Sequence, residues 1–192
     1  MRKMTTGGKL LVQTLYDLGV RNISTVAGES YLAVLDAFTE YNDLNVITCR
    51  QEGGASFMAE SWGKLTGEPG ICFVTRGPGA CNASIGVHTA MQDSTPMILF
   101  MGQVRREEKG REAFQEVDYH IMFGPLTKGV MQAFTASEVT DITQKALALA
   151  MDGRPGPVVV VLPENVTTSE SKTKEIPTPV PRPPFAADDD AI

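Results

Sequence analysis

Short apolar runs alternate with longer amphipathic stretches along this chain of 192 residues. The runs are rich in β-branched residues, and their length suits single strands. Val158–Leu162 is apolar without alternation, which is typical of a strand covered on both faces. Six such strands are predicted: Ile23–Ala27, Val46–Cys49, Ile71–Thr75, Met97–Met101, Gly129–Ala133 and Val158–Leu162.

The stretches between the runs carry the spacing of amphipathic helices. Apolar residues recur at i, i+3, i+4 and i+7 within 31–38 and within 139–149, and a further stripe runs through 11–18. Helices are also expected after Gly53 and after Gly79. Strands that alternate with helices are joined by crossover connections. The pattern therefore predicts a three-layer, doubly wound α/β fold with a mostly parallel six-stranded sheet and helices on both faces.

Composition and charge narrow the classes of protein. The chain has 17 basic and 23 acidic residues, a formal net charge of −6, which argues against a nucleic-acid partner. No run approaches the roughly 18 apolar residues of a membrane span, and the N-terminal residues lack the apolar core of a signal peptide. Three unclustered cysteines, Cys49, Cys72 and Cys81, favour reduced thiols over a disulfide framework. We therefore expect a cytoplasmic protein that has no membrane partner.

The C-terminal segment differs in composition from the rest. Five of the twelve prolines lie within 177–184, and three aspartates follow. Such a segment favours an extended polyproline conformation. We expect one domain over residues 1–170 and, over 171–192, a linker that leads to a further domain, with a frayed terminus as the alternative.

Three strand-to-helix junctions are candidates for chemistry, because ligands bind at the carboxyl ends of strands in an open parallel sheet. Glu52 lies just past a predicted strand and precedes two glycines, although an anion near a helix N-terminus is also favoured by the helix dipole alone. In 75–79 a Gly-Pro-Gly turn opens a helix and could cradle an anion, but its spacing matches neither the dinucleotide fingerprint nor the P-loop. In 28–30, Ser30 could simply cap a helix.

Other kinds of chemistry have little support in the sequence. His88 and His120 lack carboxylate or thiolate partners at short spacing, so no metal site is predicted. The Gly-x-Ser-x-Gly elbow of serine hydrolases does not occur.

A series of segments, in the same order along the chain, resembles the N-terminal pyrimidine-binding domain of thiamine-diphosphate-dependent enzymes, and within that family the acetolactate synthase-like branch. The resemblance runs from about Gly7 to Val166 and implies the flavodoxin-like thiamine-diphosphate-binding fold. Together the segments are far more specific than any one of them. They are 52–55, 77–82, 90–96, 101–104, 113–116, 127–128 and 153–158.

The resemblance implies roles for individual residues. Glu52 matches the family's cofactor-activating glutamate, whose carboxyl hydrogen-bonds N1′ of the aminopyrimidine and so promotes loss of the thiazolium C2 proton. Gly28, Pro78 and Asn82 match positions that bind the cofactor together with Glu52. Positions on the substrate side correspond to Glu29, Ser30, Phe114, Gln115 and Lys128.

The resemblance also implies which cofactors and partners are needed. Thiamine diphosphate would bind with Mg²⁺, which the family holds on a separate C-terminal domain through a Gly-Asp-Gly…Asn motif that does not occur here. FAD lies on a central domain in true synthases and is possible in the full-length protein. The diphosphate-binding domain of a partner subunit would complete the site, so 171–192 would lead to domains outside this chain, and this fragment alone would be inactive.

The implied activity is that of a transferase or lyase acting on small 2-oxo acids: carboligation after decarboxylation of pyruvate. Synthases of the family usually read Pro-Gly-Gly-Ala where this chain has Ala27–Ser30, and that loop faces the substrate. A 2-oxo acid decarboxylase or an oxalyl-CoA-type decarboxylase with the same domain is therefore the alternative. A non-catalytic nucleotide-binding or assembly module is the alternative from another class.

Two predicted helices carry apolar residues on more than one face. They follow Glu52 and Pro78, and a helix of this kind is normally buried on more than one side. Small residues such as Ala83 and Gly86 would let another backbone approach closely. We expect a homodimer or higher homo-oligomer through these helices. Cover by the proline-rich segment is the alternative.

Overall fold

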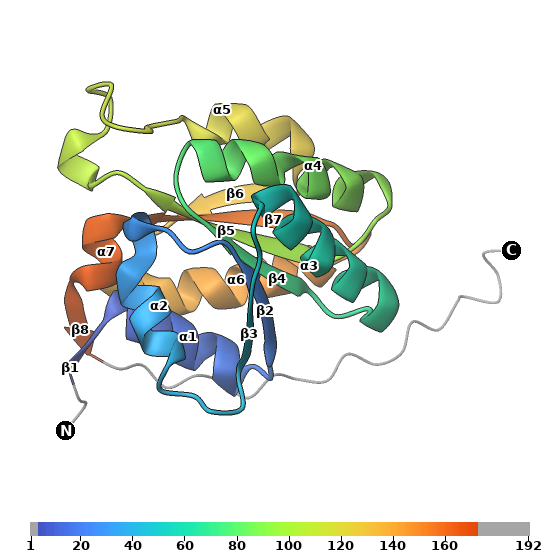
Figure 1. Cartoon of the computed structure of the whole chain (residues 1–192), viewed down its shortest axis with the longest axis horizontal. Coiled ribbons are helices and arrows are strands. Elements are labelled where there is room, and N and C mark those ends of the chain that lie inside the picture. Colours follow the sequence, from blue (N-terminus) through green and yellow to red (C-terminus); the bar gives the residue numbers. More distant parts are fainter. Residues whose placement is uncertain (1–3, 173–192) are drawn as a thin grey trace, which may run out of the picture.

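The computed structural model describes residues 4–172. Its centre is a six-stranded sheet of order β3-β2-β4-β5-β7-β6, in which every pair of neighbours is parallel (Figure 1). All six predicted strands are therefore confirmed, with ends that differ from the predicted ones by at most two residues. They are β2 (Asn22–Thr25), β3 (Asn45–Thr48), β4 (Gly70–Val74), β5 (Met97–Gln103), β6 (Gly129–Gln132) and β7 (Pro157–Pro163).

Helices cover both faces of this sheet, as predicted (Figure 1). One face packs against α1 (Gly7–Asp17), α2 (Leu32–Phe38) and α6 (Val139–Met151). The other packs against α3 (Glu52–Thr66), α4 (Pro78–Gln92) and the short α5 (Tyr119–Phe123). The connections within 4–172 contain four short 3₁₀ helices, η1 (Glu29–Tyr31), η2 (Arg106–Glu108), η3 (Gly124–Leu126) and η4 (Ala136–Glu138). A short α-helix, α7 (Glu164–Thr168), follows β7.

The central strands are buried on both faces, and this explains why their sequences do not alternate. In β4, Phe73 points into the core under α1 and α2, whereas its neighbour Cys72 points into the core under α3 and α4. Phe73 stacks on Phe100 of β5 with ring centroids 4.5 Å apart. Because both layers need apolar contacts, each position of such a strand is hydrophobic.

A second, two-stranded sheet was not predicted. β1 (Met4–Thr6) pairs antiparallel with β8 (Glu170–Lys172). Both strands have three residues and carry mainly polar side chains, so hydrophobic patterning gives no signal for them. β8 lies across the predicted boundary at 170, and the rest of the predicted linker lies outside the described residues. Within 4–172, no helix is both long enough and apolar enough to cross a membrane.

The small residues of α4 pack against α3 of the same chain. The expectation that they would let the backbone of another subunit approach closely was therefore wrong. A Cβ on Gly86 would lie 2.4 Å from Oγ of Ser56, so α3 and α4 pack closely on each other. The space that these residues leave is thus filled by this chain itself. The apolar side chains that stay exposed on the two helices are Phe57, Met58, Trp62, Leu65 and Ile85.

Candidate functional site

Because the strands of the central sheet are parallel, the loops that follow them lie at one edge, where ligands bind in folds of this kind. Two groups of polar residues gather there. One contains Glu52 and Asn82, at the starts of α3 and α4. The other contains Glu29, Arg76 and Glu164, which follow β2, β4 and β7.

Glu52 is held in the first turn of α3. The side chain of Gln51 caps this helix by accepting a hydrogen bond from the Gly54 N–H at 2.8 Å, and Glu52 is the first helical residue. The helix dipole favours a negative charge at this position. Oε2 of Glu52 accepts a hydrogen bond from Nδ2 of Asn82 at 2.9 Å, and no residue within 4–172 donates to Oε1.

The Gly-Pro-Gly turn packs closely beside this carboxylate. A Cβ on Gly79 would lie 3.4 Å from Oε1 of Glu52 and 2.9 Å from Cγ2 of Thr75, so a larger residue would have to displace its neighbours. Pro78 is the first residue of α4, where its missing N–H leaves no helical bond unmade, and it is exposed. The half-buried carboxylate of Glu52 therefore lies close to the backbone of Gly79 and is bound by Asn82.

Two buried tyrosines that were not predicted as site residues hold these loops through hydrogen bonds to their backbone. The Tyr119 hydroxyl accepts a hydrogen bond from the Gly77 N–H at 2.8 Å and donates one to the Gly102 carbonyl at 3.2 Å. The Tyr31 hydroxyl donates to the Val26 carbonyl. Burial raises the pKa of both hydroxyl groups to about 12.

These tyrosines predict a loss of stability in alkaline solution. The pKa of each is raised from 10.0 to about 12 on folding, so the neutral form stabilises the fold fully below pH 10. The contribution, about 2–3 kcal/mol per tyrosine, disappears as the pH rises through 12. Urea unfolding measured between pH 8 and 12 should show this decline, with a smaller slope for Tyr119→Phe. A Tyr119→Phe variant with the pH dependence of the wild type would contradict the assignment.

The second group is built on a buried cation. The Arg76 side chain is only 8% exposed and pairs with Glu29, whose side chain is 66% exposed. Glu164 lies on the other side of Arg76, with Oε2 at 3.8 Å from Nη1. The ring of Phe114, which is largely exposed, has its centroid 5.8 Å from Cζ of Arg76. Arg76 was not predicted as a site residue, although a charged residue directly after a buried strand is a usable signal.

The loop after β2 joins the two groups through Thr75. Oγ of Ser30 lies 2.9 Å from Oγ1 of Thr75, and Gly28 packs against the same side chain. Ser30 is fully buried within η1. The N-cap residue of α2 is Tyr31, and its side chain makes no capping hydrogen bond. The interpretation of Ser30 as a helix cap was therefore wrong. Its hydroxyl instead connects the loops that follow β2 and β4.

The remaining predicted residues lie in two different places. The Gln115 backbone packs on Gly77, so the loop after β5 covers the Gly-Pro-Gly turn. Lys128 lies just before β6, beside the amino end of β7, and therefore at the opposite edge of the sheet from Glu52. Its Nζ donates to the carbonyls of Leu149 and Asp152. The structure thus brings the other predicted residues to one edge and separates Lys128 from them.

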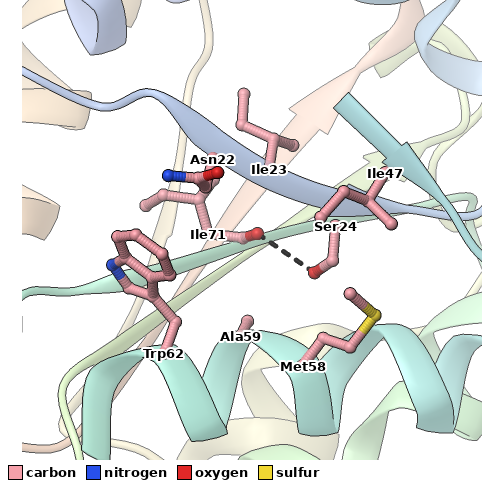
Figure 2. Close-up of a pocket in the computed structure, with 8 residues that line it drawn as sticks. All are labelled: Asn22, Ile23, Ser24, Ile47, Met58, Ala59, Trp62 and Ile71. Carbon is pink, nitrogen blue, oxygen red and sulfur yellow. Dashed lines mark hydrogen bonds between the residues drawn. The ribbon is translucent and has the colours of Figure 1, made fainter. Parts of the chain in front are cut away.

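A small cavity of about 100 Å³ lies apart from this edge, between α3 and the strands β2, β3 and β4 (Figure 2). Its walls are mostly apolar, and Figure 2 shows the hydrogen bond from the Ser24 hydroxyl to the Ile71 carbonyl. Trp62 and Met58 of α3 line it. With no titratable group in its lining, this cavity is not a candidate for catalysis. Within 4–172, no cluster of three histidine, cysteine, aspartate or glutamate side chains could hold a metal ion.

The parallel α/β fold, with the Glu52 carboxylate between the end of β3 and the start of α3, indicates the class of protein. Residues 5–122 match the family described as "Thiamine pyrophosphate enzyme, N-terminal TPP binding domain", and the chain belongs to this family. The resemblance found in the sequence is thereby confirmed.

Individual relatives are acetolactate synthases. The chain is 39% identical over 170 residues to the acetolactate synthase large subunit of Lactococcus lactis subsp. lactis (strain IL1403), a match of 88% of this chain and 30% of that protein. It is 35% identical over 170 residues to the isozyme 3 large subunit of Escherichia coli (strain K12), with the same shares. The mitochondrial catalytic subunit of Aspergillus candidus is 36% identical over 189 residues, 97% of this chain and 27% of that subunit. The chain thus spans about 30% of the length of its bacterial relatives.

Proposed function

We propose that this chain is the cofactor-activating domain of an acetolactate synthase-like enzyme, which decarboxylates pyruvate and joins the remaining two-carbon unit to a second 2-oxo acid. The observation that carries the proposal is the Glu52 carboxylate, which follows a strand end, is oriented by Asn82 and has the backbone of Gly79 close beside its Oε1. The names of the relatives support the same reaction.

The residues at this edge fit the pyrimidine end of thiamine diphosphate. A flat ring could lie close to the backbone at Gly79, which has no side chain, and a ring nitrogen could pair with the Glu52 oxygen that no described residue binds. When bound, this cofactor supplies the electron sink for cleavage of the bond between the carbonyl and carboxyl carbons of a 2-oxo acid. Diphosphate, Mg²⁺ and any FAD would be held by parts of the protein outside this chain.

Glu52 and Asn82 act as a unit in this proposal. Oε1 of Glu52 is the atom that would hold or release a proton toward a ring nitrogen, because a general acid–base group must lie within hydrogen-bond distance of its partner. The Asn82 amide holds Oε2 and so fixes the direction of Oε1. Pro78 and Gly28 line the cofactor site as packing surfaces.

The loops after β2 and β5 form the substrate side. Glu29, Phe114 and Gln115 line it, and Ser30 positions Glu29 from beneath through its bond to Thr75. Lys128 reaches this side only if a neighbouring subunit or domain brings the opposite edge of the sheet to it.

A homodimer or higher homo-oligomer, completed by the diphosphate-binding domain of a partner subunit, is part of the proposal. So is a cytoplasmic location, with which the free thiols of Cys49, Cys72 and Cys81 are compatible. A decarboxylase is the second candidate. It is favoured by Glu29, because the resembled synthases have no acid in their Pro-Gly-Gly-Ala loop.

Product analysis tests the proposal. The full-length protein, supplied with pyruvate, thiamine diphosphate and Mg²⁺, should form acetolactate, whereas acetaldehyde as the main product would identify a decarboxylase. The chain 1–192 alone should form neither and should bind the cofactor weakly in calorimetric titration, because it offers only the pyrimidine end of the site. Micromolar, Mg²⁺-dependent affinity of the isolated chain would contradict this division of the site.

A further inference from the structure

Arg76 is a buried cation whose pairing is incomplete. Nη2 donates to Glu29, but the 3.8 Å between Nη1 and Glu164 is too long for a hydrogen bond. Nε is buried and has no acceptor among the described residues. A guanidinium carries five N–H donors in a planar fork that suits a carboxylate, so Arg76 retains unused donors. Burial of such donors without partners is unfavourable, and a ligand with acceptor oxygens would relieve it.

The carboxylate that now pairs with Arg76 is easily replaced. Glu29 is mostly exposed, so its carboxylate can turn into water once another carboxylate takes its place on Arg76. Arg76 cannot follow it, because its side chain is buried. Phe114, beside the guanidinium and largely exposed, offers an apolar contact for a ligand bound there.

We propose that Arg76 is a specificity-determining residue that binds a carboxylate of the substrate, and that Glu29 occupies the guanidinium until the substrate displaces it. The exchange keeps the charge balance, since one carboxylate replaces another on the same cation. Glu164 remains as the second negative charge in both states. The inference rests on the proposed function and extends it by naming how this site recognises its substrate.

The carboxylate bound must be one that the reaction retains. Pairing with the carboxylate that leaves as CO₂ would stabilise the ground state more than the transition state, in which that charge is dispersed, and would slow the reaction. Two carboxylates meet the requirement: that of a second 2-oxo acid acting as acceptor, and the distal one of a dicarboxylic donor.

The experiment uses the full-length protein with Arg76→Gln, Arg76→Lys and Glu29→Gln. Binding of oxamate, an unreactive analogue of pyruvate, is measured by calorimetry, and KM is measured with pyruvate or acetaldehyde as acceptor. Arg76→Gln should weaken oxamate binding and raise KM for the acid acceptor by roughly 10- to 100-fold, with KM for acetaldehyde close to wild type. Arg76→Lys should give an oxamate affinity and a KM for the acid acceptor between those of the wild type and Arg76→Gln. Glu29→Gln should tighten oxamate binding, because its side chain no longer competes for Arg76.

A second substrate distinguishes the two possible sources of the carboxylate, and a control variant tests whether any arginine replacement has the same effect. If Arg76 binds the distal group of a donor, its replacement raises KM for 2-oxoglutarate and not for the acceptor. Arg21→Gln, a change at the opposite end of β2, should leave all values unchanged. Equal losses with acid and neutral acceptors, or an Arg76→Gln variant whose oxamate affinity and KM for 2-oxoglutarate both stay at the wild-type values, would overturn the inference. Failure of the proposed function would be seen separately, as absence of C2-proton exchange in the wild type.

Discussion

Replacement of Glu52 by glutamine in the full-length enzyme should slow exchange of the cofactor C2 proton by roughly 10²- to 10⁴-fold, the range for loss of a general acid–base group. Cofactor affinity should change little, because the amide has nearly the same shape and can still form a hydrogen bond. The amide cannot share a proton with the ring nitrogen, so only activation is lost. The rate of exchange into D₂O, followed by NMR after acid quench, measures this step directly.

Two further variants place limits on the interpretation. Asn82→Ala should slow exchange less than Glu52→Gln, because the carboxyl remains but its Oε2 loses the bond that fixes its direction. Glu68→Gln, an exposed acid just beyond α3, serves as the matched control and should exchange like the wild type. If Glu52→Gln exchanges at the wild-type rate, Glu52 is not the activating residue.

The architecture was predictable because the strands are covered on both faces. Runs such as Val158–Leu162 need apolar side chains at every position, and that requirement is visible in the sequence without knowledge of neighbours. The pairing of β1 with β8 was not predictable, because two three-residue strands pair through their backbones and bury little apolar surface. The role of the Tyr119 hydroxyl was hidden for a similar reason: its partners are backbone groups from distant loops.

The site was predictable only in part. The series of family motifs, in the same order along the chain, identified Glu52 and Asn82. In the structure a hydrogen bond joins these two side chains. Arg76 escaped because the burial of a charged side chain depends on the loops packed around it. Lys128 was grouped with the substrate side, yet it lies at the opposite edge. Strand order, which local sequence does not specify, decides which loops meet.

The exposed face of α3 and α4 leads to the last prediction. The two helices lie side by side over one face of the sheet (Figure 1), and their outer surface keeps several large apolar side chains in solvent. Leu65 is 85% exposed and Ile85 54%, and Phe57 and Trp62 are each 38% exposed. Met58 and Trp62 also line the neighbouring apolar cavity (Figure 2). Large apolar side chains exposed together on neighbouring helices indicate an interface, and a two-fold pair buries the same residues on both copies.

The full-length protein should therefore be a dimer or a higher oligomer through this face. Light scattering coupled to size-exclusion chromatography should give a multiple of the chain mass at micromolar concentration. A charge at Phe57 or Ile85 (Phe57→Asp, Ile85→Asp) would be buried without a partner in the interface, which costs about 3–5 kcal/mol and weakens association by at least about 100-fold. Phe134→Asp is the matched control, since Phe134 is 55% exposed but belongs to neither helix and follows the edge strand β6. A monomeric wild type at high micromolar concentration, or variants that associate like the wild type, would exclude α3 and α4 as the interface.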